Sequence, residues 1–449
     1  MNNIQKFALY YLLLVSLLAY GYAVGRFGVF PGEHLDSLVD EVTAFNAGSP
    51  GEKETSVLEK LQNDMGLSFN RFRYSYPEQA TQNSRSLTTP AFADGRDNPL
   101  VYVAPEHRAG YRIIVAALNL EDSFWGALLL SPDGEVIHSW NLSTSHLPTN
   151  KAEDHMKNLY GVHVYSDGSV IFNMQEDGGG IVKVDACSNP VWGLEGDYHH
   201  VISPTQEGSF WSFTGTMEHF NQDLVLASEH TGEILKTIRM KDVRKANPGL
   251  HIWDLYNHGF NKPAVKKKLG DMTHGNDIDP LNEELARLFP QFKPGDILVS
   301  YATTNLVFVL DPESLKVKWW RVGATDFQHD PDWEQDGSIV VFSNNKRTRK
   351  FSDIVSINPA TYRHEILLKG RKYNFTPGIN GMHQKTSYGT RMITSAQQGW
   401  AFEVNDRGRL VFSFVNVVDR EAGESLHLAD ALRVEESYFE TPFWDACAQ

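Results

Sequence analysis

The chain has 449 residues, 12% of them aromatic, and a formal net charge of −15. A protein this acidic lacks the basic face that phosphate contacts require, which argues against a nucleic-acid partner. The short basic run at 266–268 is interpreted as a solvated loop rather than a binding patch. The length accommodates two or three ordinary domains or one large repeat fold.

An uncharged apolar run occupies residues 7–24 and is about long enough to cross the hydrocarbon core of a membrane. Because Lys6 precedes it, we expect residues 1–27 to form a single-pass anchor with the following chain exported. A cleaved signal peptide and a buried helix are the alternatives, although Gly21-Tyr22-Ala23 is a poor cleavage site. The polar segment 28–110 is interpreted as a membrane-proximal stalk.

From Tyr111 onward, short apolar runs alternate with turn residues. These pairs restart near residues 111, 160, 198, 272, 327 and 381, an interval of about 35 to 50 residues. Repeats of this length with four strands each are typical of propeller blades. We therefore predict an all-β, six-bladed β-propeller over 111–420, followed by a tail over 421–449. The stretch from Met240 to Met272 has no strand pattern and is expected to be a loop or helical excursion.

Five of the repeats carry a histidine upstream of a turn that contains glycine. After His329, for example, come Asp336-Gly337 and an apolar run, a pattern that indicates a hairpin. In a propeller the first strand of each blade lines the central channel, so we expect the five imidazoles to share one cavity. A histidine hydrogen-bonded for structural reasons is the alternative at each position. The five are His163, His200, His274, His329 and His383.

Further polar residues adjoin these histidines, namely His199, Asn276, Arg347 and Arg349. A guanidinium matches the oxygens of an oxyanion in a bidentate way, so imidazoles and arginine together predict an anion pocket. A solvated basic loop is the alternative for the arginines. The sequence has no HExxH and almost no cysteine, and we expect no metal. No cofactor is expected either, because the glycine run 178–180 lacks a βαβ context.

Two cysteines, Cys187 and Cys447, are present. Our hypothesis is that they pair and tie the C-terminal tail to an early repeat, as an oxidising compartment would permit. The alternative is one buried and one free thiol.

Several stretches together resemble the arylsulfate sulfotransferase family over residues 110–418. They read GYRIIVAALN, LLSPDGEVIHSW, DYHH, HGNDID and QHDPDWEQDGSIVVFSN. The resemblance implies a six-bladed propeller with a histidine-lined channel. It also implies transfer of a sulfuryl group from a small aryl sulfate to a phenolic acceptor, without a nucleotide donor, through a sulfated histidine.

The resemblance further implies roles for individual residues. His383 would be the nucleophile, and His329 would bind the sulfuryl oxygens or protonate the leaving phenolate. Arg347 would clamp the same oxygens, with Arg349 as the second choice.

The remaining residues would complete the cradle around the substrate, with His274 among the catalytic groups. They are His274 and Asn276, His200, His199 and His163. Two rival functions stay open: a noncatalytic propeller that binds a ligand or protein, and a metal-dependent hydrolase or lyase on the same scaffold.

Overall fold

A computed structural model describes residues 72–92, 96–148, 157–175, 179–215, 222–253, 273–347, 351–376 and 378–447. All of them belong to one compact unit, Asn70–Gln449. The expected anchor over 1–27, and most of the expected stalk, lie outside the described residues. Within the described ranges no helix is both long and apolar enough to cross a membrane.

The described part of the chain is mostly β, as expected, and its strands form antiparallel sheets. Five sheets have four strands and one has six, and each begins on a strand near one of the predicted repeat starts. A small additional sheet consists of β1 (Arg73–Ser75), β28 (Glu424–Leu426) and β27 (Val417–Asp419).

Three four-stranded sheets are built from strands between residues 111 and 238, and one of them also contains a strand from 428–434. They are β29 (Leu428–Val434), β4 (Tyr111–Ala117), β5 (Trp125–Leu130) and β6 (Val136–Leu142); β7 (Asn158–Val164), β8 (Val170–Gln175), β9 (Gly180–Val184) and β10 (Pro190–Glu195); and β11 (Tyr198–Pro204), β12 (Ser209–Thr214), β13 (Asp223–Ser228) and β14 (Ile234–Ile238).

The other three sheets are built from strands between residues 275 and 415, and the last of them also contains two strands from residues 85–103. They are β15 (Gly275–Pro280), β16 (Ile297–Tyr301), β17 (Leu306–Asp311) and β18 (Lys316–Val322); β19 (Gln328–Trp333), β20 (Ile339–Ser343), β21 (Asp353–Ile357) and β22 (His364–Lys369); and β23 (Met382–Lys385), β24 (Arg391–Ser395), β25 (Trp400–Val404), β26 (Leu410–Val415), β3 (Leu100–Val103) and β2 (Arg85–Ser86).

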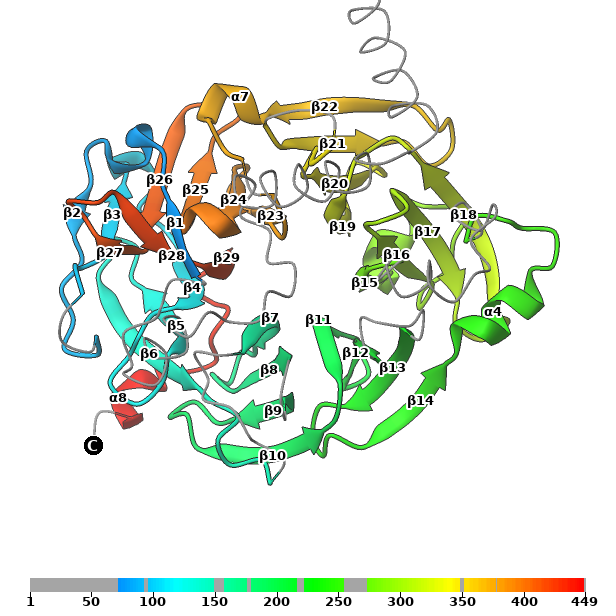
Figure 1. The fold of residues 1–449 in the computed structure, drawn as a ribbon, viewed down its shortest axis with the longest axis horizontal. Helices are drawn as coiled ribbons and strands as arrows, with labels where there is room; N and C mark the ends of the chain where they lie inside the picture. Colours follow the sequence, from blue (N-terminus) through cyan, green and yellow to red (C-terminus); the bar gives the residue numbers. More distant parts are fainter. Residues whose placement is uncertain are drawn as a thin grey trace, which may run out of the picture. The chain divides into compact units, whose positions relative to one another are not determined.

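These six sheets stand in a ring, with strands β7, β11, β15, β19, β23 and β29 nearest its centre (Figure 1). Neighbouring sheets are held together by shared apolar clusters. Phe213 from β12, for example, packs in one cluster with Phe308 from β17 and Tyr301 from β16. Burying each such side chain contributes about 1.5–3 kcal/mol. The inner strands are therefore fixed in position by packing behind them.

The ring closes through both ends of the described chain. β29, from the stretch expected as a tail, pairs with β4, while β3, from the expected stalk, pairs with β26. Glu403 of β25 binds Arg112 of β4 at 3.1 Å, and it also binds Arg433 of β29. All three side chains are buried. Strands outside 111–420 are thus integral to the ring.

The helices within the described residues are short. They are α4 (Met240–Ala246), α6 (Glu283–Ala286), α7 (Gly370–Tyr373) and α8 (Trp444–Cys447), with 3-10 turns η2 (Glu78–Thr81), η3 (Pro105–His107) and η5 (Ala396–Gln398). Of these, α4, α6 and α7 directly follow strands. α4 opens the predicted excursion after β14, of which residues 254–272 lie outside the described residues. Cys187 and Cys447 form a disulfide, which confirms the pairing hypothesis.

Candidate active site

Bulges re-aim the side chains of the inner strands. The pairing register shifts in β7, β11, β15 and β19, in β19 between His329 and Asp332. His200, His274 and Asp330 adopt left-handed backbone angles, with φ of 66°, 51° and 51°. Such a conformation costs a non-glycine residue roughly 1–2 kcal/mol. The bulges thus turn side chains that a regular strand would aim elsewhere.

Four histidines meet at the start of three adjacent inner strands. The ring centroids of His200 and His274 are 4.9 Å apart, and those of His274 and His329 are 6.5 Å apart. His199 reaches His200 with 2.6 Å between the two Nδ1 atoms. Tyr160 stacks on His200 at 4.8 Å. We call His199, His200, His274 and His329 the histidine cluster.

His329 is held as a neutral ring. Its Nδ1–H donates to Oδ1 of Asn344 (2.7 Å), and its Nε2 accepts from the backbone N–H of Asn380 (3.3 Å). Burial, reinforced by His274, lowers the pKa of His329 to about 3. With both nitrogens engaged in hydrogen bonds, the ring of His329 is fixed in its orientation.

Arg347 borders the histidine cluster. Its guanidinium Nη2 donates to the carbonyl of Thr303 (2.9 Å), and its backbone N–H donates to Asp326 (2.8 Å). Phe327 lies between the guanidinium, 5.8 Å from the ring centroid, and the ring of His274, 5.7 Å away. Arg347 is 41% exposed, so it offers a solvated positive charge at the edge of the cluster. Arg349 lies outside the described residues.

Asn276 lies at the boundary between β15 and β19. Its amide donates to the carbonyl of Gln328 (2.8 Å), while its Oδ1 is buried without a hydrogen-bond partner among the described residues.

His383 occupies a different environment from the histidine cluster. Its Nδ1 lies 3.4 Å from Oδ2 of Asp332 and 3.1 Å from a guanidinium nitrogen of Arg391. Its backbone N–H donates to the carboxylate of Asp330. The side chain is buried, and Nε2 has no hydrogen-bond partner among the described residues. Burial and the charge of Arg391 lower the pKa of His383 well below its usual range.

The five histidines do not occupy equivalent positions in their strands. His329 pairs with Phe342 at the start of β19, whereas His383 pairs with Ile393 and His163 pairs with Ile171 next to its hairpin. His163 contacts Tyr165 at 4.7 Å. Because side chains alternate along a strand, a different register sends each imidazole to a different place.

An acidic cluster lies beside the histidines, and sequence reasoning missed it. It consists of Asp277, Asp279, Asp330, Asp332 and Asp430, from β15, β19 and β29. Burial is the largest cause that raises the pKa of each one, and mutual repulsion adds to it for Asp277, Asp330 and Asp332. The pKa reaches about 7 for Asp279 and about 6 for Asp430. Two Asp-x-Asp pairs on consecutive inner strands were the available signal.

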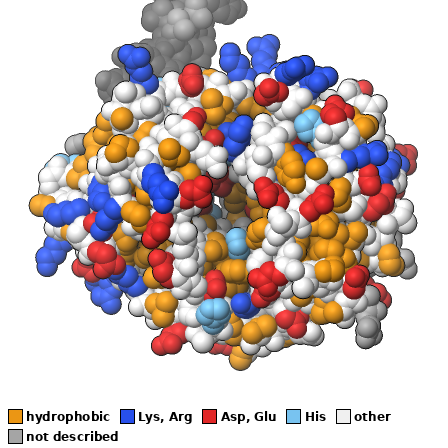
Figure 2. Space-filling view, turned by 180° about the vertical axis from the view of Figure 1, so that it is seen from behind, with side chains coloured by type: hydrophobic (Ala, Val, Ile, Leu, Met, Phe, Trp, Pro, Cys, Tyr) orange, Lys and Arg blue, Asp and Glu red, His pale blue; other side chains and the backbone are white. Residues whose placement is uncertain are grey.

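Figure 2 shows a hollow near the middle of one face of the molecule, with a histidine side chain inside it. Acidic side chains lie around the hollow in the same view.

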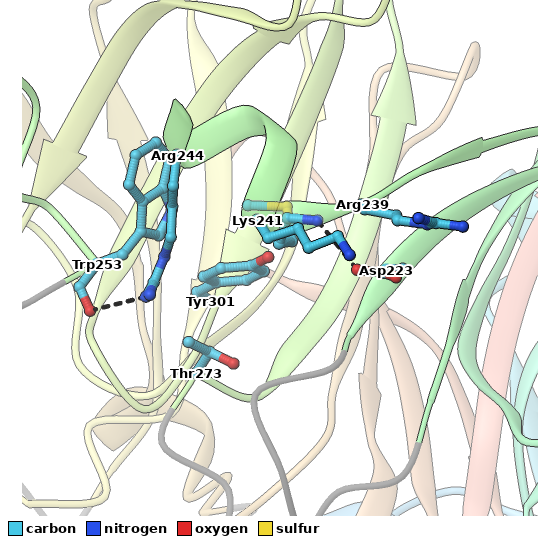
Figure 3. Close-up of a pocket in the computed structure, with 8 residues that line it drawn as sticks. Asp223, Arg239, Lys241, Arg244, Trp253, Thr273 and Tyr301 are labelled. Carbon is cyan, nitrogen blue, oxygen red and sulfur yellow. Dashed lines mark hydrogen bonds between the residues drawn. The ribbon is translucent and has the colours of Figure 1, made fainter. Parts of the chain in front are cut away.

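A separate pocket of about 350 Å³ lies between α4 and the ends of β13 and β16 (Figure 3). Arg239, Lys241 and Arg244 give it a basic lining, and Trp253 forms part of its wall. Thr273, which precedes His274 in the chain, also lines it.

Comparison with known protein families identifies one family. The family model described as "Arylsulfotransferase (ASST)" matches residues 161–417, more than half of the chain. No curated protein matches it.

Solved structures resemble the chain only distantly. A protein of unknown function from Bacteroides caccae is 11% identical over 73% of this chain and 100% of its own, with a TM-score of 0.46. The Dos1 propeller is 12% identical over 75% of both chains, with a TM-score of 0.37. No functional argument rests on either. The family match, which spans the inner strands β11, β15, β19 and β23, shows that this chain belongs to the arylsulfotransferase (ASST) family.

Proposed function

We propose that this protein is an arylsulfate sulfotransferase, which moves a sulfuryl group from an aryl sulfate to a phenol through a sulfated histidine. One observation carries the proposal: His200, His274 and His329 come together from three sheets beside Arg347, in a chain of the ASST family. Family membership supports the two small aromatic substrates.

His383 remains our candidate for the nucleophile. A neutral imidazole with a lone pair on Nε2 can attack sulfur, and splitting the transfer into two displacements lowers each barrier. The lowered pKa of His383 keeps its ring neutral, and Nε2 has no hydrogen-bond partner among the described residues. In this role Nδ1 carries the proton and faces Asp332, 3.4 Å away, which requires the guanidinium of Arg391, a donor 3.1 Å from the same nitrogen, to turn toward its other partner Glu334.

The proposed steps conserve atoms and charge. Nε2 of His383 forms a bond to sulfur while the bond from sulfur to the aryl oxygen breaks, and the phenolate receives a proton from His274. The acceptor phenol then returns a proton to His274 and attacks the sulfur, which releases His383. Arg347 supplies positive charge to the sulfuryl oxygens, while His329 and Asn276 hold the wall of the site.

Two further features belong to this proposal. Six sheets of four or more strands in a ring support a six-bladed propeller. The Cys187–Cys447 disulfide supports export to an oxidising compartment, with residues 1–27 as the anchor.

The test is a transfer assay with a chromogenic aryl sulfate as donor and a phenol as acceptor. We expect His383→Ala to abolish transfer and to prevent trapping of a labelled sulfuryl group on the protein. His364→Ala, an exposed histidine on β22, is the control and should retain both. If His383→Ala still traps the label, the nucleophile is another histidine. If the unaltered chain neither transfers nor traps it, the proposed function is wrong.

A further inference from the structure

The acidic cluster concentrates negative charge that the surrounding chain does not balance. The negative charges of Asp279 and Asp430 repel that of Asp330, and the charge of Asp277 also repels that of Asp332. Arg391 is the basic side chain that acts on Asp330, but it is already paired with Glu334 at 2.6 Å. Carboxylates gathered in this way are stabilised by a cation or by a proton.

Three side chains in the cluster have the geometry of a coordination site. One ligand atom from each of Asp330, Asp332 and His383 lies within 4.8 Å of the other two. Donors that share one ion at bond lengths of about 2.0–2.6 Å lie roughly 3–5 Å apart, so a single ion can reach all three after small side-chain adjustments.

The imidazole of His383 is an independent indication of a ligand. Its side chain is fully buried, it enters the cluster beside Asp332, and its Nε2 has no hydrogen-bond partner among the described residues. A buried polar nitrogen left without a partner is rare and calls for an explanation. Asp332 is 34% exposed, which gives an ion a route from solvent to this ring.

We propose that Asp330, Asp332 and His383 bind one divalent transition-metal ion. Carboxylate oxygens alone suit Mg²⁺ and Ca²⁺, whereas an imidazole among them favours Zn²⁺ or Mn²⁺. The ion offsets the repulsion among the five aspartates. Short-range sequence motifs do not reveal these three ligands, because the ligands come from two strands of different sheets.

The ion and the sulfuryl group require the same imidazole, so this part of the inference rests on the proposed function. A neutral imidazole has a single nitrogen lone pair, so a ring that coordinates the ion has none left for attack on sulfur. Occupancy of the site therefore inhibits sulfuryl transfer, and removal of the ion restores it.

The binding test uses the full chain after treatment with EDTA, titrated with ZnCl₂ and MnCl₂ in a calorimeter. We expect one ion per chain and at least tenfold weaker binding in Asp332→Asn and in His383→Gln. Asp430→Asn is the matched control, because it removes one carboxylate of the same cluster that is not among the three ligands; its affinity should change less than threefold. Thermal melts in EDTA confirm that each variant is folded.

Two results would overturn the site: no binding by the unaltered chain, or equal affinities in all variants. Addition of Co²⁺ as a probe gives a second readout, since ligation by His383 changes its visible spectrum and His383→Gln removes that change. Transfer that persists at saturating Zn²⁺ would overturn the shared use of His383. Because binding is measured without substrate, its outcome is separate from that of the sulfotransferase assay.

Discussion

The histidine cluster and the acidic cluster use the same inner strands and yet are opposites in chemistry. His329 and Asp330 are neighbours in the chain, but a bulge sends one toward imidazoles and the other toward carboxylates. In both clusters, burial is the main cause of the pKa shifts: it lowers the pKa of His200 and His329 and raises that of Asp330. Burial disfavours whichever form is charged.

The comparison changes how the site must be interpreted. The sequence predicted that the imidazoles and arginine together form one pocket for an anion. Because His200 and His329 are held neutral, the lasting positive charge beside the histidine cluster comes from Arg347 and Lys346, both of which approach the ring of Phe327. In the proposed function, the neutral histidines would therefore attack sulfur or relay protons, and Arg347 would bind the sulfuryl oxygens.

The strongest test removes an imidazole from the centre of the histidine cluster. We expect His274→Ala to lower kcat/KM for an aryl sulfate by about 10²–10³-fold, because the phenol proton then has no positioned donor. Steady-state kinetics and a thermal melt measure activity and folding separately. Activity within threefold of the unaltered chain would contradict the role of His274 as the proton donor.

Arginines in the two regions should differ in their effect on stability. Arg391→Gln leaves Glu334 buried without its partner, so we expect the free energy of unfolding to fall by about 2–4 kcal/mol. Arg347→Gln alters an exposed ion pair and should cost less than about 1 kcal/mol. Urea denaturation measures both. Equal losses would show that the acidic region does not depend on buried pairing.

The pH dependence of stability separates the clusters again. The pKa of Asp279 is about 7 in the folded chain and near 3.8 when unfolded, so the folded state holds the extra proton between these values. Stability from this group is present at low pH and is lost as pH rises through about 7. In EDTA, Asp279→Asn should therefore be more stable than the unaltered chain by about 1–2 kcal/mol at pH 8. The difference should shrink toward pH 4; a constant difference in thermal melts would contradict the assigned shift.

The smallest effect is expected at the edge of the histidine cluster. Tyr160 stacks on His200, and Tyr160→Leu removes that aromatic contact. We expect kcat/KM to fall two- to fivefold, which corresponds to about 0.5–1 kcal/mol. A loss as large as that of His274→Ala would show that Tyr160 takes part in the reaction rather than only supporting His200.

Much of the fold was predictable because hairpin chemistry is local. The carboxylate of Asp336 accepts a hydrogen bond from the backbone N–H of Ser338, and Gly337 adopts a φ of 80°. The sequence Asp-Gly-Ser is therefore sufficient to predict this turn. The strand restarts predicted near 198 and 327 lie within a residue of β11 and β19. Local patterns therefore located the starts of these sheets correctly.

The register of the inner strands was not predictable in this way. A bulge of one residue reverses the face of everything after it, and nothing in the letters around His329 distinguishes a bulged strand from a regular one. The sequence therefore indicated candidate histidines without indicating that His383 would face Asp332. Arg391 went unnoticed for the same reason, since it acts from the neighbouring strand β24.

The pairing of β29 with β4 has a consequence for biosynthesis. During translation, residues 111–142 emerge about three hundred residues before their partner strand, so the inner edge of that sheet stays open until synthesis is nearly finished. An unpaired strand edge invites association with other chains. Nascent chains should therefore need chaperones until β29 has been synthesised and has paired with β4. The Cys187–Cys447 disulfide then links the C-terminal segment covalently to the closed ring.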